Sequence, residues 1–210
     1  RLTASDIKKM EEEIEYRKLV VRKRELEAVK EARAQGDLSE NFEYKAAKQA
    51  CSKCAQMGGL HLEGPYFAYE MKGAQDPKHL RNPLPEEYAT LLEQADGVIA
   101  RWSLAPELEG AAEMAQELRK RGIVMAMGHT NATFEECEMA YEAGFTHMTH
   151  FYSCMSTITR RNAYRYAGVI EYGYYNDGVT CELIGDGIHV PKSLLQLMFK
   201  IKGAERLALC

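Results

Sequence analysis

Short apolar runs alternate with helix-like segments from residue 58 to residue 210, and this alternation is the strongest constraint on the fold. We predict strands at 60–62, 98–103, 123–127, 145–149, 179–184 and 207–210, and helices near 85–94, 106–121, 133–143 and 191–201. Strands that alternate with helices are typical of a parallel sheet built from βα units. A closed (β/α)8 barrel takes about 200 to 250 residues, and only about 150 are available here. The prediction is therefore an α/β fold, an incomplete (β/α)8 TIM-like barrel.

Six strands are too few to close such a barrel. We therefore expect an open sheet with exposed strand edges and exposed apolar surface. Low stability or aggregation is predicted, unless a partner chain supplies the missing strands.

Three residues with metal-binding side chains lie one or two positions past the ends of three of the predicted strands. Glu63 lies in Leu-Glu-Gly-Pro, His129 in Gly-His-Thr-Asn-Ala, and His150 in Thr-His-Phe-Tyr. In a βα fold, residues just past the carboxyl ends of the strands face the active site. One carboxylate and two imidazoles at three such ends suit a catalytic zinc ion with one open coordination position. Taken alone, each histidine is more often a buried structural residue than a ligand.

Residues 1–57 have a different pattern, which predicts a separate domain ahead of the domain at 58–210. Apolar residues recur roughly every 3.5 positions between charged ones, as in a coiled coil. They are Ile7, Met10, Ile14, Val21, Leu26 and Val29. Gly36 favours a helix end, and Asp37 or Ser39 then caps a second helix. We predict an antiparallel α-helical coiled-coil hairpin with Asp37 and Glu40 at its tip. Plain helix capping would also explain these two acids.

The composition excludes several classes of protein. The net charge of −4 shows no overall bias toward nucleic acid or anionic membranes. No apolar run is long enough to cross a bilayer, and the N-terminus does not resemble a signal peptide. The six cysteines have no framework spacing, which suits a reducing compartment, so a cytoplasmic protein is expected. Cys51 and Cys54 lack a second pair, and we interpret them as free thiols rather than a zinc ribbon.

The first 50 residues resemble a known family. Leu-Thr-Ala at residues 2–4, the Glu-rich first helix and the run from Glu31 to Lys48 are similar to the N-terminal coiled coil of the Gre transcript-cleavage factors. The resemblance implies a hairpin that enters the secondary channel of RNA polymerase. It also implies that Asp37 and Glu40 help to hold Mg²⁺, which needs few protein ligands. The similarity ends after Gln49, and the C-terminal domain of that family is absent from this sequence.

Residues 59–210 resemble the N-acetylglucosamine-6-phosphate deacetylase family of the amidohydrolase superfamily. Six motifs in the expected order carry the resemblance, and they are Gly-Leu-His-Leu-Glu-Gly-Pro-Tyr-Phe (59–67), Lys-Gly-Ala-Gln (72–75), Leu-Ala-Pro-Glu (104–107), Gly-His-Thr-Asn-Ala (128–132), Thr-His-Phe-Tyr-Ser-Cys-Met (149–155) and Asp-Gly-Ile-His (186–189). The resemblance implies a parallel barrel, a divalent metal such as zinc, an amino-sugar phosphate as substrate and a homodimer.

The resemblance also implies roles for individual residues. Glu63, His129 and His150 match the metal ligands, whereas His61 and His147 do not. The residues that match substrate-binding positions are Ala74, Gln75, Ser153, Cys154, Arg161 and His189. Among them, Arg161 matches a phosphate-binding residue, and a guanidinium suits phosphate because it donates two parallel hydrogen bonds. Without the resemblance, Arg161 would be interpreted as a surface residue.

The implied reaction is metal-assisted hydrolysis of the N-acetyl amide, with an Asp after the last strand as general base and then acid. That Asp is expected in a Thr-Asp-Ala motif just beyond Cys210, and the first barrel strands are replaced by the hairpin. We therefore expect impaired deacetylase activity. The alternative function is a hairpin that binds RNA polymerase and promotes transcript cleavage. Because no physical logic links the two parts, our hypothesis for their origin is a fusion of two partial genes.

Overall fold

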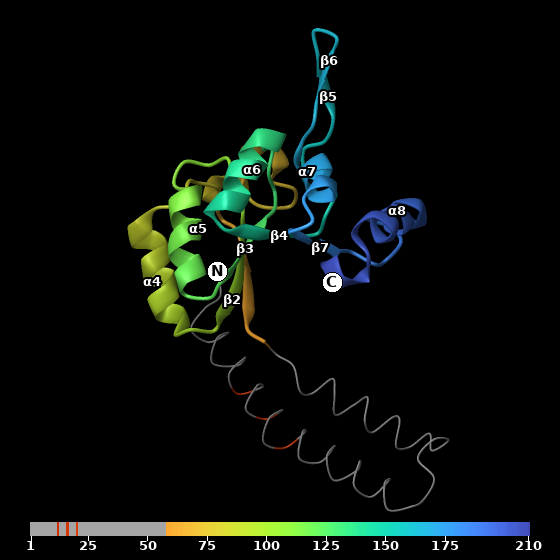
Figure 1. Ribbon diagram of the computed structural model, residues 1–210. Coiled ribbons are helices and arrows are strands. Elements are labelled where there is room, and N and C mark those ends of the chain that lie inside the picture. Colours follow the sequence, from red (N-terminus) through yellow and green to blue (C-terminus); the bar gives the residue numbers. More distant parts are fainter. Residues whose placement is uncertain (1–11, 13–15, 17–19, 21–57) are drawn as a thin grey trace, which may run out of the picture. The chain divides into compact units, whose positions relative to one another are not determined.

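The computed structural model describes residues 12, 16, 20 and 58–210 (Figure 1). The chain divides into two compact units, residues 1–58 and residues 59–210. Glu12 and Tyr16 are helical and exposed. Apart from these two residues and Val20, the predicted hairpin, including Asp37 and Glu40 at its tip, lies outside the described residues, as do Cys51 and Cys54. The domain boundary at residue 57 and the coiled coil therefore stay predictions.

The second unit is built on a six-stranded parallel sheet (Figure 1). Its strands, in spatial order, are β1 (Leu60–Glu63), β2 (Ile99–Leu104), β3 (Val124–Met127), β4 (Phe145–Met148), β7 (Thr180–Leu183) and β8 (Leu207–Leu209). Neighbours in the sheet are also neighbours in sequence except for β4 and β7, which are separated by an inserted hairpin. The sheet is a parallel half-barrel with β1 and β8 as its edges.

Helices connect successive strands in the order that a βα fold requires. They are α4 (Pro85–Ala95), α5 (Ala111–Lys120), α6 (Phe134–Ala143), α7 (Val169–Tyr175) and α8 (Lys192–Lys202). Short 3-10 turns are η2 (Tyr69–Met71), η3 (Pro77–His79) and η4 (Ala204–Arg206). Local chemistry defines α6: the Thr133 side chain accepts from the Glu136 amide, and Glu136 accepts in return from the Thr133 amide.

One face of the sheet is apolar and packs against the helices. Side chains alternate along a strand, so every second residue of β3 and β7, and Trp102 and Leu104 at the end of β2, point toward this core. Its largest member is Trp102, which is fully buried and donates from Nε1 to the Gly64 carbonyl oxygen at 2.9 Å. The other strand residues of the cluster include Leu104, Met125, Met127, Met148, Cys181 and Leu183.

The opposite face of the same strands is polar. Its residues are His61 and Glu63 on β1, Arg101 and Ser103 on β2, His147 on β4, and Thr180 and Glu182 on β7. The register pairs His61 with Arg101, Glu63 with Ser103 and His147 with Thr180, so these side chains are lateral neighbours. Parallel strands covered on both faces are apolar throughout. The polar face of this sheet is therefore not covered by an apolar layer, and it is the face that can carry a functional site.

The predicted α/β class and half-barrel are confirmed, and the six predicted strands are present with no end shifted by more than one residue. The predicted start of a helix at residue 106 is wrong, because α5 begins only at Ala111. The Glu107 carboxylate instead accepts hydrogen bonds from Thr130 Oγ1 and the Asn131 amide, both at 2.6 Å, which holds the preceding turn out of the helix. The predicted low stability stays a prediction.

Helix α7 and the two-stranded antiparallel hairpin of β5 (Thr159–Arg161) and β6 (Tyr164–Tyr166) were not predicted. The hairpin extends away from the sheet between β4 and α7 (Figure 1). None of the helices in the described part of the chain combines the length and apolarity needed to cross a bilayer.

Candidate metal centre

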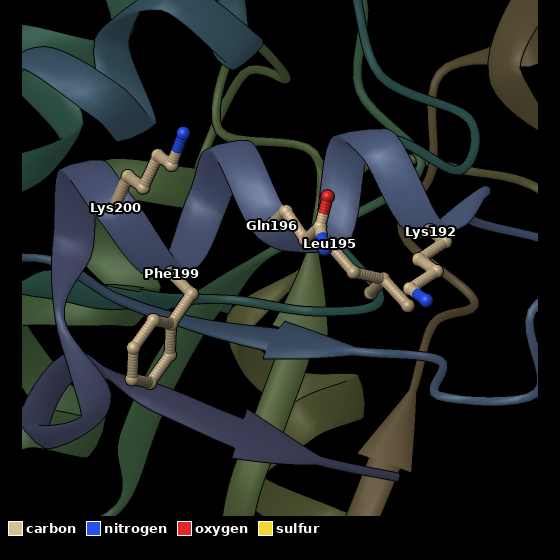
Figure 2. A pocket seen from close by; sticks show the side chains of 5 residues that line it. All are labelled: Lys192, Leu195, Gln196, Phe199 and Lys200. Carbon is tan, nitrogen blue, oxygen red and sulfur yellow. The ribbon is translucent and has the colours of Figure 1, made fainter.

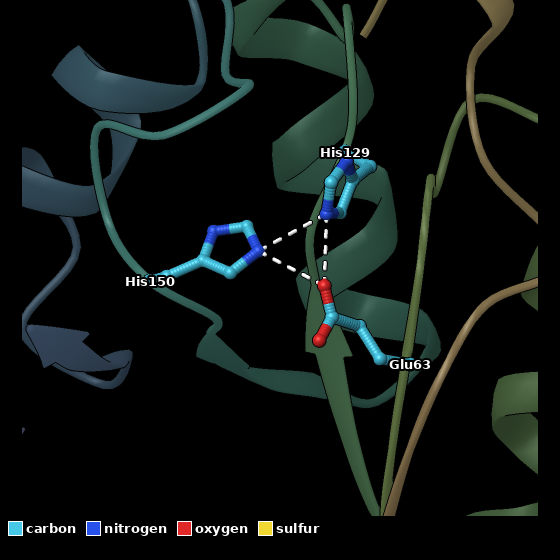
Figure 3. Close-up of side chains that lie close together, drawn as sticks. All are labelled: Glu63, His129 and His150. Carbon is cyan, nitrogen blue, oxygen red and sulfur yellow. Dashed lines mark hydrogen bonds and ion pairs between the residues drawn. The ribbon is translucent and has the colours of Figure 1, made fainter. Parts of the chain in front are cut away.

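Three side chains converge at the carboxyl ends of β1, β3 and β4 (Figure 3). Glu63 Oε1 lies 2.8 Å from His129 Nε2 and 3.1 Å from His150 Nε2. The two Nε2 atoms are 3.1 Å apart. Glu63 is the last residue of β1, and each histidine lies two residues past its strand. The structure thus brings together the three residues that the sequence analysis selected as metal ligands.

The backbone is strained at both histidines. His129 has a φ of 51° and His150 a φ of 32°, in the left-handed region that non-glycine residues rarely adopt. Such conformations cost about 1 to 3 kcal/mol each and gather at functional sites. They turn each chain away from its strand direction just where the imidazole must point across the strand ends.

The surroundings of His129 determine which ring nitrogen carries its hydrogen. Nδ1 lies 2.7 Å from the Met71 carbonyl oxygen, which can only accept, so Nδ1 is the donor. In the neutral ring Nε2 then has a lone pair, and this lone pair faces Glu63. The ring is held by Phe67, which stacks on it with centroids 4.2 Å apart, and a Cβ at Gly73 would lie 3.2 Å from its Cε1.

The His150 ring differs from the His129 ring in that its second nitrogen, the buried Nδ1, has no hydrogen bond among the described residues. Burial lowers its pKa, but the hydrogen bond and the charge of Glu63 outweigh burial, and the pKa of His150 is raised. The pKa of Glu63 is lowered, first by the hydrogen bonds with His129 and His150. Glu63 is therefore a carboxylate at neutral pH.

These donors fit a divalent metal. A carboxylate oxygen and the Nε2 lone pairs of two neutral imidazoles repel one another, and a metal cation or a ring proton between them removes that repulsion. Tetrahedral zinc with bonds of about 2.0 to 2.2 Å places its ligand atoms about 3.3 Å apart. The three separations of 2.8, 3.1 and 3.1 Å are close to that value. Three protein ligands also leave the fourth position open, as in catalytic sites.

Below the triad, Arg101 joins the polar side chains of four strands. Its Nη1 lies 2.9 Å from His147 Nε2, and its Nη2 lies 2.7 Å from both His61 Nδ1 and Glu182 Oε1. Because a guanidinium only donates, both histidines accept here and carry their hydrogens on the other nitrogen. His147 then donates to Thr180 Oγ1 at 2.7 Å and His61 to Ser103 Oγ at 2.6 Å.

The two histidines bonded to Arg101, His61 and His147, are neutral at pH 7. Burial and then the charge of Arg101 lower the pKa of His147 to about 4, and the same two causes lower the pKa of His61. With both ring nitrogens hydrogen-bonded to protein, neither ring has a lone pair for a metal. Arg101 and Glu182 were missed by the sequence analysis, although the alternation Arg-x-Ser in β2 and Thr-x-Glu in β7 signals a polar strand face.

Two predicted substrate segments border the triad. Gln75 lies in the turn after η2, where its amide donates to the Lys72 carbonyl, and Ala74 is its neighbour. A Cβ at Gly73 would lie 3.0 Å from Cys154 Sγ, so this turn and the second segment are adjacent. Ser153 donates its amide to the His150 carbonyl at 2.9 Å. The loops that the resemblance implies for substrate thus frame the metal centre.

Arg161 and His189 lie farther out. Arg161 is exposed on β5, over the Tyr166 ring, and lines a cavity of about 320 Å³ with Asn131, Arg165 and other residues. His189 Nδ1 donates to Asp186 Oδ2 at 2.6 Å. The Ile188 amide, and after it the His189 side chain, lower the pKa of Asp186 to about 2. Within the described residues, neither Arg161 nor His189 has a hydrogen bond or ion pair with the triad.

A second cavity lies on α8 and contains none of the candidate site residues. Its volume is about 400 Å³, and Figure 2 shows the five side chains that line it, Lys192, Leu195, Gln196, Phe199 and Lys200. Its lining has no carboxylate, histidine or cysteine, so it offers no set of metal ligands.

Comparison with known proteins finds similarity to two kinds of protein, one for each part of the chain. Residues 1–56 match the GreA/GreB family described as "Transcription elongation factor, N-terminal". The N-acetylglucosamine-6-phosphate deacetylase of Bacillus subtilis is 36% identical over 167 residues, which cover 80% of this chain and 41% of that protein. The N-acetylgalactosamine-6-phosphate deacetylase of Escherichia coli O157:H7 is 30% identical over 160 residues, 73% of this chain and 41% of that protein.

Solved structures agree. N-acetyl-D-glucosamine-6-phosphate deacetylase from Mycobacterium smegmatis is 34% identical, with a TM-score of 0.68 over 78% of this chain and 42% of that one. The Thermotoga maritima enzyme is 37% identical, with a TM-score of 0.64 over 72% of this chain and 39% of that one. The chain spans about two fifths of the length of these relatives. Most of this chain is therefore similar in sequence and fold to part of an N-acetylglucosamine-6-phosphate deacetylase, while residues 1–56 match the N-terminal region of GreA/GreB elongation factors.

Proposed function

We propose that residues 58–210 form the metal-binding part of a deacetylase that hydrolyses the N-acetyl amide of N-acetylglucosamine 6-phosphate. The observation that carries the proposal is the convergence of Glu63, His129 and His150, with His129 Nε2 directed at Glu63 because Nδ1 donates to Met71. The deacetylase relatives supply the substrate class. Zinc is the proposed metal, because two imidazoles and one carboxylate are its usual catalytic ligands.

A divalent metal at this centre supplies the Lewis acidity that amide hydrolysis needs. The protein's own groups have separate tasks in the proposal. Glu63, His129 and His150 hold the metal. The turn with Ala74 and Gln75 and the segment of Ser153 and Cys154 border it and contact the amino sugar.

The outer residues complete the proposed substrate site. The forked guanidinium of Arg161 receives the phosphate, and His189, oriented by Asp186, donates a hydrogen bond to the sugar. A homodimer and a cytoplasmic location are further parts of this proposal.

Proton transfer in amide hydrolysis needs a further carboxylate beside the metal. Among the described residues, Glu63 is the one carboxylate that hydrogen-bonds the ring of His129 or His150, and it is itself a proposed metal ligand. For the 210-residue polypeptide itself we therefore propose metal binding with weak or no turnover, since general acid–base catalysis typically contributes about 10²- to 10⁴-fold.

The test is a calorimetric titration of Zn²⁺ into the chelator-treated 210-residue protein, followed by a deacetylation assay with N-acetylglucosamine 6-phosphate. The expected result is one tight zinc site and little acetate release. Absence of zinc binding by folded protein would refute the metal centre. Rapid acetate release would refute only the impairment.

A second function is proposed for residues 1–56, because this segment matches the GreA/GreB N-terminal family. We propose that it binds RNA polymerase, with Asp37 and Glu40 at a tip that holds Mg²⁺. Competition with an intact Gre factor for polymerase tests binding. Stimulated transcript cleavage that is lost in Asp37→Asn tests the tip. Failure to compete would exclude this function without affecting the metal proposal.

A further inference from the structure

We propose that Glu182, itself held by Arg101, is the positioning residue for the metal ligand His150. The inference rests on the proposed metal centre. It adds a second layer to that centre: a buried ion pair on β2 and β7 that determines where the imidazole from β4 points.

The two histidine ligands differ in how their rings are oriented. A metal-binding histidine usually donates its second ring nitrogen to a carbonyl or carboxylate, which fixes the ring. His129 follows this rule through Met71. His150 does not, because its Nδ1 is buried without a hydrogen-bond partner among the described residues. The orientation of His150 must therefore come from its backbone.

Glu182 holds that backbone at two successive amides. The ladder between β4 and β7 ends with Met148 opposite Cys181, and the chain then turns away. Beyond this point the His150 amide donates to Glu182 Oε2 at 3.3 Å, and the Phe151 amide donates to the Glu182 carbonyl oxygen at 2.8 Å. The side chain and the main chain of Glu182 thus both hold the backbone of residues 150 and 151, which we call the ligand turn.

These two hydrogen bonds hold His150 in a strained backbone conformation. With its φ of 32°, His150 has left the regions that a β-carbon favours. Such a residue keeps its conformation only when its surroundings over-determine it. Loss of the Oε2 contact would let the turn relax and swing the imidazole away from Glu63 and His129.

Arg101 keeps the Glu182 carboxylate in place. Their ion pair of 2.7 Å is largely buried, with side-chain exposures of 22% and 9%. Glu182 Oε1 accepts from Arg101 while Oε2 remains available to His150. Two further guanidinium hydrogens bond His61 and His147, which helps to keep Arg101 in the pair.

The test compares Zn²⁺ affinity and the visible absorption of the Co²⁺-loaded protein in the full chain and in Glu182→Gln. Glutamine keeps the shape but cannot accept from Arg101 and His150 with two charged oxygens. Outer partners of metal ligands are typically worth about 10- to 100-fold in affinity, so a weakening of this size is expected, with a changed Co²⁺ spectrum.

The matched control is Thr180→Ala. It removes a hydrogen bond to His147 from the same face of the same strand and leaves the ligand turn untouched. Its zinc affinity and Co²⁺ spectrum should equal those of the wild type, even where its stability falls. Equal losses in Thr180→Ala and Glu182→Gln would show a merely structural network and overturn the inference.

The remaining outcomes separate this inference from the function on which it rests. If the wild type binds no zinc, the proposed metal centre fails and the inference with it. If the wild type binds and folded Glu182→Gln binds equally well, only the inference fails. Should circular dichroism show that Glu182→Gln does not fold, Arg101→Lys replaces it, since lysine keeps the charge but loses the fork. Unchanged affinity in that variant would likewise overturn the inference.

Discussion

His129 donates from Nδ1 to the carbonyl oxygen of Met71 across 2.7 Å, and this bond determines which ring nitrogen faces Glu63. Met71 ends a 3-10 turn and lies far from His129 in sequence. A main-chain acceptor cannot titrate, so it selects the same tautomer at every pH at which the ring is neutral. The direction of the Nε2 lone pair of the neutral ring, toward Glu63, is therefore a property of the fold.

Removal of one proposed ligand should abolish tight metal binding. For His129→Gln we expect zinc affinity to fall by more than the roughly 10- to 100-fold typical of outer partners, because a direct ligand is lost. Calorimetric titration of the chelator-treated protein measures this. The matched control is His79→Gln, a histidine on η3 outside the triad, which should bind like the wild type. Equal loss in both variants would argue against the site.

Protonation of His147 should make the fold sensitive to mild acid. Its pKa is lowered to about 4 in the folded protein, against an ordinary value near 6.5. The unfolded chain therefore binds this proton first, and the stability contributed by the neutral ring is present above pH 6.5 and is lost as the pH falls toward 4. Between pH 7 and pH 5 the loss is about 2 kcal/mol, since each pKa unit corresponds to about 1.4 kcal/mol.

Urea unfolding at pH 7 and pH 5 in the presence of chelator measures this dependence. Carboxylates with ordinary pKa values near 4 contribute little in this window. In His147→Gln the drop between the two pH values should be smaller by about 2 kcal/mol. Identical drops in both proteins would contradict a buried neutral His147.

The start of α6 should be sensitive to its cap. Thr133→Ala removes the acceptor of the Glu136 amide and should destabilise the protein by about 0.5 to 2 kcal/mol. Thr90→Ala is the control, because Thr90 lies inside α4 and bonds only the Glu86 carbonyl. Thermal unfolding followed by circular dichroism compares the two. A change in Thr90→Ala as large as that in Thr133→Ala would remove the capping argument.

A methyl group at Gly173 should not fit between α7 and the ligand turn. Its Cβ would overlap the ring of the buried Phe151 and lie 2.6 Å from Met148 Sδ. Overpacking of this kind costs about 1 to 3 kcal/mol, which exceeds the helix propensity that alanine gains over glycine. Gly185→Ala is the control, since its nearest neighbour is Leu209 Cδ2 at 3.4 Å. Denaturant unfolding in which Gly173→Ala is as stable as the wild type would refute the overlap.

Sequence reasoning found the features that depend on local pattern. Each sheet strand lies in a short segment with apolar residues at alternate or successive positions, and Glu63, His129 and His150 lie at or within two residues of the ends of such segments, so both the strands and the triad could be predicted. Helix α7 could not, because its sequence Val-Ile-Glu-Tyr-Gly-Tyr-Tyr is rich in β-branched and aromatic residues, which favour strands. Its helix is instead favoured by Glu171, which accepts from the Gly168 amide, and by contact with α6.

The polar network could be found only in part. Arg101 and Glu182 each occupy an alternating polar position, and that much is visible in the sequence. Their pairing depends on the spatial order of the strands, because the side chains must meet between β2 and β7, which are separated in the sheet by β3 and β4. The β5–β6 turn at Asn162 and Ala163 was missed for another reason: both residues have positive φ, and alanine does not signal such a turn.

The triad has a consequence for how assembly of this sheet can be followed. Glu63 is separated from His129 by 66 residues and from His150 by 87, so no local segment can bring the three together. Each ligand reaches its place only after β1, β2, β3 and β4 have paired in register, because a slip of one residue would turn a ligand to the opposite face. With the proposed metal centre, the rate of zinc binding during refolding would measure long-range strand pairing in the half-barrel, and it could be compared with the rate of helix formation.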